Sequence, residues 1–74
     1  MKYRYHVIDY LGQRSEPLGS MRAARSHALD KCKEKHTPMF VYRYDAKNPH
    51  ARGSIVGHAE YAGWLDEAKF YKED

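Results

Sequence analysis

The histidines are the side chains of this sequence best suited to metal chemistry, and there are five of them: His6, His27, His36, His50 and His58. A metal site needs several ligands that converge with fixed geometry, and none of these intervals matches a recognised ligand spacing. If the strands of His6 and His58 are adjacent, the two histidines meet on one sheet face, so a two-histidine site is a minor alternative to a half-exposed pair. We predict that the protein has no metal site and no cofactor.

The sequence also lacks the arrangement that nucleophilic catalysis requires, a serine or cysteine beside an oriented histidine. Ser26 and His27 are neighbours in a predicted helix, where adjacent side chains diverge. Asp66 and Glu67 fall in a predicted surface turn, and no phosphate-binding or dinucleotide-binding glycine motif is present. A chain of this length also leaves little volume for a small-molecule pocket of ~300 Å³ or more. We therefore predict no catalytic residues and no enzymatic activity.

Length and composition indicate one globular domain spanning residues 1–74. The chain is 42% hydrophobic and 31% charged, which is too apolar for a disordered tail. No run approaches the ~20 apolar residues of a membrane span, so we expect no membrane association and a cytoplasmic location. Cys32 is the single cysteine, which excludes an intramolecular disulfide, and we expect it to pack in the core.

The segment from Ser20 to His36 is the clearest helix in the sequence. Its apolar residues recur at steps of three and four and form one stripe, with Leu29 on its flank: Met21, Ala24, Ala28 and Cys32. The Ser20 hydroxyl is placed to accept a hydrogen bond from the first turn, and Pro38 disfavours helical geometry just beyond the end. The stripe should therefore face a sheet.

Alternating apolar and polar residues predict the strands of that sheet, which we place at residues 2–10, 14–17, 39–45 and 54–61. Residues 63–71 indicate a short closing helix or turn. The expected fold is α+β, with a single helix packed on one face of a small, mostly antiparallel three- to four-stranded sheet. The predicted order is ββαββ, followed by the C-terminal helix or turn.

One helix covers only one face of such a sheet. We expect the helix-facing residues to be Tyr3, Tyr5, Val7, Phe40, Tyr42, Ile55 and Ala59. The other face would then carry Arg4, His6, Ile8, Tyr10, Val41, Arg43, Val56 and His58. An aliphatic centre rimmed by arginine and tyrosine has the composition of a protein interface, so this face is the predicted partner-binding site.

The alternative for the same face is that the C-terminal segment folds back over it. Trp64, Leu65 and Phe70 would then form a second small core there. The substitution Val41→Lys separates the two interpretations. In an interface a lysine should abolish association and leave the melting of the monomer about normal, whereas in a core it should destabilise the domain by several kcal/mol or prevent folding. We favour the interface.

Basic residues form a second candidate site. Thirteen Lys and Arg face ten Asp and Glu, which gives a net charge of +3 that permits nucleic-acid binding without requiring it. The residues that would contact phosphates or an acidic partner lie on one helix edge and in a loop: Arg22, Arg25, Lys33, Lys47 and Arg52.

Three features of the sequence together resemble a known layout. They are the Tyr-His-Val of the first strand, the alanine-rich helix after a serine, and Val41-Tyr42-Arg43 followed across a loop by Gly53-Ser54-Ile55-Val56. The chain is similar in plan to small uncharacterised bacterial and phage proteins, some of which inhibit CRISPR systems. The resemblance implies a small non-enzymatic interaction protein that docks on a protein or ribonucleoprotein and modulates it. A small basic nucleic-acid-binding module is the alternative, and a homodimer stays open.

Overall fold

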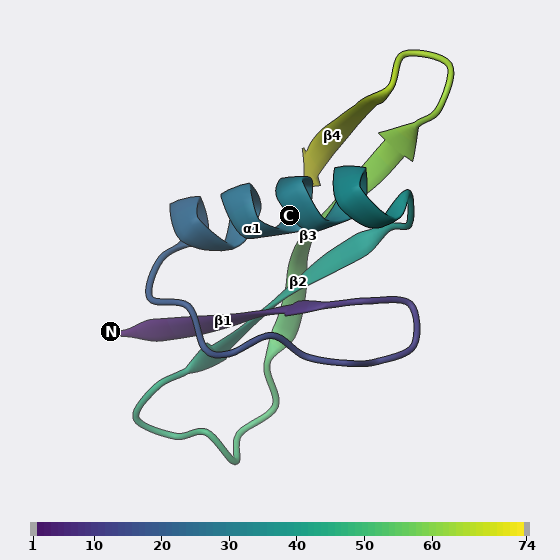
Figure 1. Ribbon diagram of the computed structural model, residues 1–74. Coiled ribbons are helices and arrows are strands. Elements are labelled where there is room, and N and C mark those ends of the chain that lie inside the picture. The colour runs from purple at the N-terminus through teal and green to yellow at the C-terminus, as the bar shows by residue number, and fades with distance from the viewer. Residues whose placement is uncertain (1, 74) are drawn as a thin grey trace.

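The computed structural model describes residues 2–73, in which one helix lies across a four-stranded antiparallel sheet (Figure 1). The elements in chain order are β1 (Tyr3–Ile8), α1 (Met21–Lys35), β2 (Met39–Asp45), β3 (Ser54–Ala62) and β4 (Glu67–Lys72). The strands lie in the sheet in the order β1-β2-β3-β4, and each neighbouring pair is antiparallel. The α+β class is confirmed, but the element order is βαβββ rather than ββαββ.

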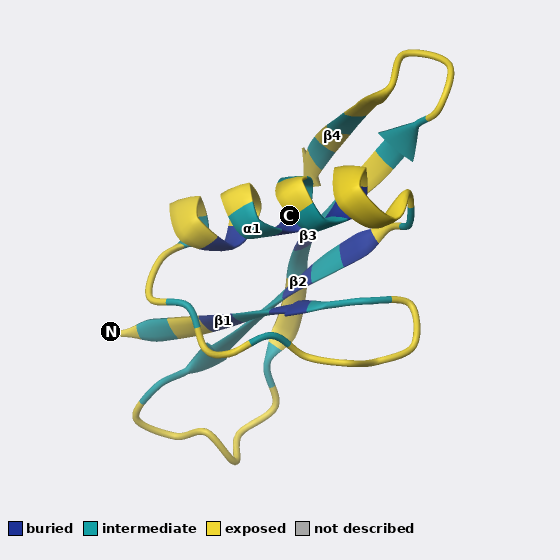
Figure 2. Cartoon of the chain, viewed as in Figure 1, coloured by how far each residue is buried: buried dark blue, intermediate teal, exposed yellow. Residues whose placement is uncertain are grey.

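Helix α1 begins and ends where the sequence predicts. Ser20 is the N-cap, and its hydroxyl oxygen accepts a hydrogen bond from the Ala23 N–H at 3.1 Å. His36 ends the helix in the left-handed conformation, at a φ of 56°. Ala24, Ala28 and Cys32 are completely buried on the sheet side of the helix (Figure 2). The predicted apolar stripe is therefore the face of α1 that packs on the sheet.

Residues 14–17, which we expected to form a second strand, instead follow the outer edge of β1 with only isolated bridges at Arg14 and Leu18. Leu18 and Tyr5 exchange two backbone hydrogen bonds, of 2.8 and 3.0 Å. Two residues further along β1, the Val7 N–H donates to the Ser15 hydroxyl instead of to a backbone carbonyl. Pro17 precedes Leu18, at a position where a backbone N–H would point away from β1, so its missing donor is tolerated at this edge. The segment therefore covers an edge of the sheet without being a strand.

The C-terminal segment forms a strand where we expected a short helix or turn. A turn over residues 63–66 leads into β4, which pairs with β3 from Ala62↔Glu67 to Gly57↔Lys72. A helix this short is marginal by itself, whereas a hairpin with β3 satisfies the backbone groups of both segments. Trp64 and Leu65 are 85% and 40% exposed in the turn, so they do not cover the sheet.

The expected faces are confirmed for β1 and wrong for β2. Tyr5 and Val7 are buried beneath α1, and Ala59 of β3 is also buried. In β2 the buried residues are Met39 and Val41, because the register places Val41 opposite Val7. Alternation separates the two faces of a strand, but it does not say which face is buried when both are apolar. Phe40 and Tyr42, expected under the helix, lie on the outer face, and Ile55 is 40% exposed.

A register shift between β2 and β3 explains the position of Val56. Val41 pairs with Gly57 and Tyr42 pairs with Ile55, so Val56 is the extra residue of a β-bulge and packs against the core. Gly57 is buried beneath the Phe70 ring, which occupies the space that a Cβ atom would need. Phe70 therefore lies on the helix side of the sheet.

The β3–β4 hairpin is fastened to the end of α1. The rings of His36 and Tyr61 stack with their centroids 4.1 Å apart and their planes within 8°. The Tyr61 hydroxyl donates a 2.6 Å hydrogen bond to an oxygen of Asp66, which adopts the left-handed conformation in the turn. This hydrogen bond lowers the pKa of Asp66 and raises the pKa of Tyr61. The contact orders the hairpin turn relative to the helix.

Removing the Tyr61 hydroxyl should make stability less dependent on acid pH. Because the pKa of Asp66 is lowered on folding, the ionised Asp66 carboxylate contributes to the stability of the folded state above about pH 4. This stabilisation is lost as the pH falls through the folded-state pKa of Asp66. The variant Tyr61→Phe should melt below the wild type at about pH 6, and this difference should shrink below about pH 4. Thermal melts across this range test the expectation, with Tyr71→Phe as the matched control. A difference that is independent of pH would contradict it.

Candidate binding surface

The outer face of the sheet, opposite α1, carries a band of aromatic and imidazole rings that crosses all four strands. We call these residues the ring band: His6, Phe40, Tyr42, Tyr44, His58 and Tyr71. They share this face because His6 pairs with Tyr42, Phe40 with His58, and His58 with Tyr71 across the strands. Tyr71 is 46% exposed and the other members are half-buried.

The rings of the band contact one another in two groups. On β1 and β2, His6 stacks on Tyr44 at a centroid distance of 5.2 Å, and Tyr44 lies 6.1 Å from Tyr42. On β2, β3 and β4, the His58 ring lies between Phe40 at 6.3 Å and Tyr71 at 5.4 Å. Contacts of this kind fix the ring orientations, so the surface is ordered before any partner arrives.

Two side chains of the band are also held by backbone groups. His6 Nδ1 donates to the Ser15 carbonyl oxygen at 2.8 Å, since a carbonyl can only accept. The Tyr42 hydroxyl accepts a 2.8 Å hydrogen bond from the Gly53 N–H. The segment along the edge of β1 and the loop between β2 and β3 thus both position residues of this surface.

The two halves of the band differ in charge. On the β1–β2 half, the Arg14 guanidinium lies 5.4 Å from the Tyr42 ring centroid, and Arg4 is opposite Tyr44. On the β3–β4 half, His58 lies between carboxylates, with Glu60 at 3.3 Å and Glu73 at 3.6 Å. The surface is therefore apolar and aromatic along its centre and basic at one end. The other end carries both signs, because Lys69 of β4 lies opposite Glu60.

The predicted partner-binding residues divide between the two sides of the sheet. Arg4, His6, Ile8 and His58 lie on the outer face as expected. Tyr10 is 64% exposed in the turn beyond β1. The prediction is wrong for Val41, Arg43 and Val56, which lie on the helix side. The Arg43 guanidinium there lies 4.4 Å from the Tyr3 ring centroid.

Sequence reasoning missed the four aromatic residues of the band, Phe40, Tyr42, Tyr44 and Tyr71. The signal that could have found the first three was their strict alternation along β2. An aromatic ring at every second residue is equally compatible with a buried face and an exposed one. Only the pairing of β2 with β1 decides between them.

The predicted basic set does not join the ring band. Arg22, Arg25 and Lys33 are exposed on α1, which covers the opposite face of the sheet, and Lys47 and Arg52 are exposed in the β2–β3 loop. Arg25 also lies over the Phe70 ring, 5.9 Å from its centroid. Phosphate binding by the helix edge would therefore use a surface separate from the aromatic one.

His6 and His58 share the outer face, but they do not meet. Strand β2 lies between β1 and β3, so the two histidines are two strand spacings apart, or about 10 Å. The adjacent strands that a two-histidine site requires are therefore absent for this pair. Among residues 2–73, no three histidine, cysteine or acidic side chains are grouped as metal ligands.

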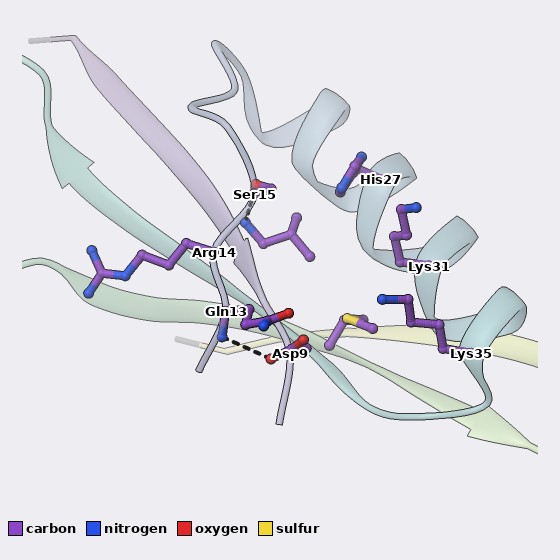
Figure 3. Close-up of a pocket in the computed structure, with 9 residues that line it drawn as sticks. Asp9, Gln13, Arg14, Ser15, His27, Lys31 and Lys35 are labelled. Atoms are coloured by element: carbon purple, nitrogen blue, oxygen red, sulfur yellow. Dashed lines mark hydrogen bonds between the residues drawn. The ribbon is translucent and has the colours of Figure 1, made fainter. Parts of the chain in front are cut away.

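A small cleft runs between α1 and the segment that covers the edge of β1 (Figure 3). Its volume is about 140 Å³, with Val7 and Met39 among its apolar lining residues. His27, Lys31 and Lys35 line it from successive turns of the helix. Across from them, the Asp9 carboxylate is already occupied, because it accepts hydrogen bonds from the N–H groups of Leu11 and Gln13. Figure 3 shows the Arg14 side chain pointing away from the helix.

A larger hollow lies beside the first turn of α1. Its volume is about 480 Å³, and its lining residues are Tyr5, Met21, Arg43, Ser54, Ile55, Val56, Lys72 and Glu73. The hollow is larger than we expected for so short a chain. It holds no grouped nucleophile and base. Its exposed lining is more polar than apolar, so it is a recess of mixed character in which apolar side chains lie beside charged ones.

Cys32 has the environment of a structural cysteine. Its side chain is completely buried between α1 and the sheet. Burial raises the pKa of the thiol, and the charge of Glu60 acts in the same direction. A raised pKa keeps the thiol protonated and therefore poorly nucleophilic.

Comparisons with known proteins identify no relative of this chain. No protein-family model, curated protein or solved structure matches the chain. Within residues 2–73, no helix has both the length and the apolar character needed to cross a bilayer.

Proposed function

We propose that this protein is a non-enzymatic interaction protein that docks the outer face of its sheet on a protein or ribonucleoprotein and thereby modulates it. The observation that carries the proposal is the ring band, in which six rings cross all four strands on the face that α1 leaves uncovered. Tyrosine and other aromatic residues are enriched where proteins meet partners, and arginine is enriched with them. The protein acts in the cytoplasm, and it has no catalytic step.

The charge distribution favours a protein surface over a polyanion. Arg4 and Arg14 border one end of the band, and Glu60 and Glu73 border the other. A nucleic acid lying along the whole band would meet two carboxylates near His58, whereas a protein surface can complement both signs. The partner therefore presents an apolar centre, an acidic end opposite Arg4 and Arg14, and an end of mixed charge opposite Glu60, Lys69 and Glu73. The resemblance to phage inhibitors makes a CRISPR ribonucleoprotein the first defined partner to assay.

A pair of matched variants tests the proposal. The variant Arg4→Glu with Tyr71→Ser changes both ends of the outer face at exposed positions. The control Arg22→Glu with Lys33→Ser changes exposed positions on α1. A partner isolated with the wild type should bind the face variant roughly tenfold or more weakly and should keep its affinity for the helix variant. Equal binding by both variants, or loss with the helix variant alone, would refute docking through the sheet.

A second candidate function is binding of single-stranded nucleic acid on the β1–β2 half of the band. It is favoured by the arginine at Tyr42 and the arginine opposite Tyr44, since base stacking on aromatic rings beside cationic groups is the usual basis of such binding.

Salt dependence separates this candidate from protein docking. Binding of a single-stranded oligonucleotide should weaken with a log–log slope of roughly −0.7 per phosphate neutralised. The double variant Arg4→Gln with Arg14→Gln should reduce both the affinity and the slope. No binding at ~50 mM salt would eliminate the nucleic-acid candidate and leave the protein-docking proposal standing.

A further inference from the structure

The turn between β3 and β4 displays a large apolar side chain far from the ring band. Trp64 is 85% exposed and its neighbour Leu65 is 40% exposed. Figure 1 shows this turn projecting past the end of α1, at the opposite end of the helix from Met21. Asp66 and Glu67 follow in the chain and are also exposed, and the charges of Lys33 and His36 on α1 act on Asp66. The tip of the hairpin is therefore apolar, and Glu67 is the acidic group beside it that no ion pair within residues 2–73 involves.

The projecting turn is structurally ordered. Backbone hydrogen bonds link Leu65 N–H to the Ala62 carbonyl and Asp66 N–H to the Gly63 carbonyl. The Tyr61–Asp66 hydrogen bond and the stack of Tyr61 on His36 hold its base against α1. A tryptophan on an ordered turn loses little conformational freedom on binding, which is the property of a residue that dominates an interface.

The hollow beside Met21 offers apolar side chains and cations, which complement the exposed Trp64 and the acidic Glu67 of the hairpin tip. Its lining includes the apolar side chains of Tyr5, Met21 and Val56, and its volume of about 480 Å³ is enough for a small organic ligand. It is bordered by the cations Arg43 and Lys72. Its one carboxylate, Glu73, lies 3.6 Å from the His58 ring on the outer face. None of the ion pairs within residues 2–73 involves either cation.

The hairpin tip and the hollow of one molecule cannot meet. The protein is elongated, 41 Å along its longest axis, and the tip and the first turn of α1 lie at opposite ends of the helix (Figure 1). We propose that the Trp64 tip of one copy inserts into the Met21–Val56 hollow of a second copy, with Glu67 facing Arg43 and Lys72. The contact joins different surfaces, so repetition produces a closed ring or an open head-to-tail chain. It is independent of the ring band and of the function proposed for it.

The purified full chain suffices to test this association. Trp64 is the only tryptophan in the sequence, so its emission reports the environment of the tip directly. From about 1 μM to about 1 mM protein, the weight-average mass should rise while the emission maximum shifts to the blue. The variant Trp64→Ser should weaken association by roughly tenfold or more at unchanged melting temperature. Ser54→Glu with Lys72→Glu, two exposed positions on the hollow, should do the same.

Mixing these two variants distinguishes a head-to-tail contact from a symmetric one. The tip variant retains an intact hollow and the hollow variant retains an intact tip, so the mixture should form a one-to-one heterodimer that grows no further. A chain that stays monomeric at about 1 mM would overturn the proposal. So would association that survives Trp64→Ser, or two monomeric variants that fail to pair when mixed.

Discussion

The substitution Val41→Lys should unfold the protein or come close to doing so. Val41 is completely buried in the cluster that includes Val7, Met39 and Cys32. A lysine there would remove apolar packing and place an ammonium group where it has no counter-ion and no water. We expect a loss of about 3 kcal/mol or more, which is most of the stability of a domain that has ~5 kcal/mol in total. Chemical denaturation followed by circular dichroism measures this loss.

The matched control for Val41→Lys is Ile55→Lys on the neighbouring strand. Ile55 is also a branched aliphatic residue in the sheet, but it is 40% exposed, so a lysine can reach water. Its cost should stay near the ~0.5 kcal/mol typical of surface changes. If Val41→Lys melted like the wild type, Val41 would belong to an exposed face, as the sequence-based prediction has it, and the burial described above would be wrong.

The substitution Gly53→Ala should destabilise the protein although it adds only one methyl group. A Cβ atom at Gly53 would overlap the carbonyl oxygen of Arg43 and come within 2.6 Å of the Tyr42 ring. Backbone cannot move aside as easily as the end of a long side chain, so the loop itself has to shift. That shift would also disturb the 2.8 Å hydrogen bond from Gly53 N–H to the Tyr42 hydroxyl. We expect a cost of about 1–3 kcal/mol.

Gly63→Ala provides the control, since the same methyl group there would meet only Tyr61, at an ordinary 3.6 Å. Its effect should be below ~0.5 kcal/mol. Denaturant titration of both variants gives the comparison. If Gly53→Ala and Gly63→Ala were equally stable, the loop before β3 would accommodate the added methyl group, and the predicted overlap at Gly53 would be wrong. Because Tyr42 belongs to the ring band, Gly53→Ala should also weaken binding of any partner that uses that band.

Local sequence signals determined α1 because each of them acts within a few residues. The Ser20 hydroxyl reaches the Ala23 N–H three residues on, and the small residues Ala24, Ala28 and Cys32 recur at the helical period. The same is true of β1, whose buried Tyr5 and Val7 alternate with half-exposed neighbours. These predictions are confirmed because no distant segment is needed to satisfy them.

Long-range pairing decided the C-terminal segment and the edge of β1. Residues 67–72 become a strand because β3 offers them a hydrogen-bonded partner, which outweighs the weak helical preference of so short a segment. Residues 14–17 contribute only the isolated bridge at Arg14, since the Ser15 hydroxyl takes the place of a backbone acceptor for the Val7 N–H. Neither outcome follows from the local sequence, because each depends on the position of another strand.

The sequence by itself determined that this protein packs one face of its main helix on a mostly antiparallel sheet. Only the tertiary structure decided that the other sheet face is left uncovered and which residues it displays. Along β2 the aromatic residues Phe40, Tyr42 and Tyr44 alternate with Met39 and Val41, and both sets are apolar enough to be buried. The register of Val41 opposite Val7 places the smaller set beneath α1 and the rings outside. Alternation along a strand separates its residues into two faces but does not say which face is buried, so the neighbouring strands and the helix decide it.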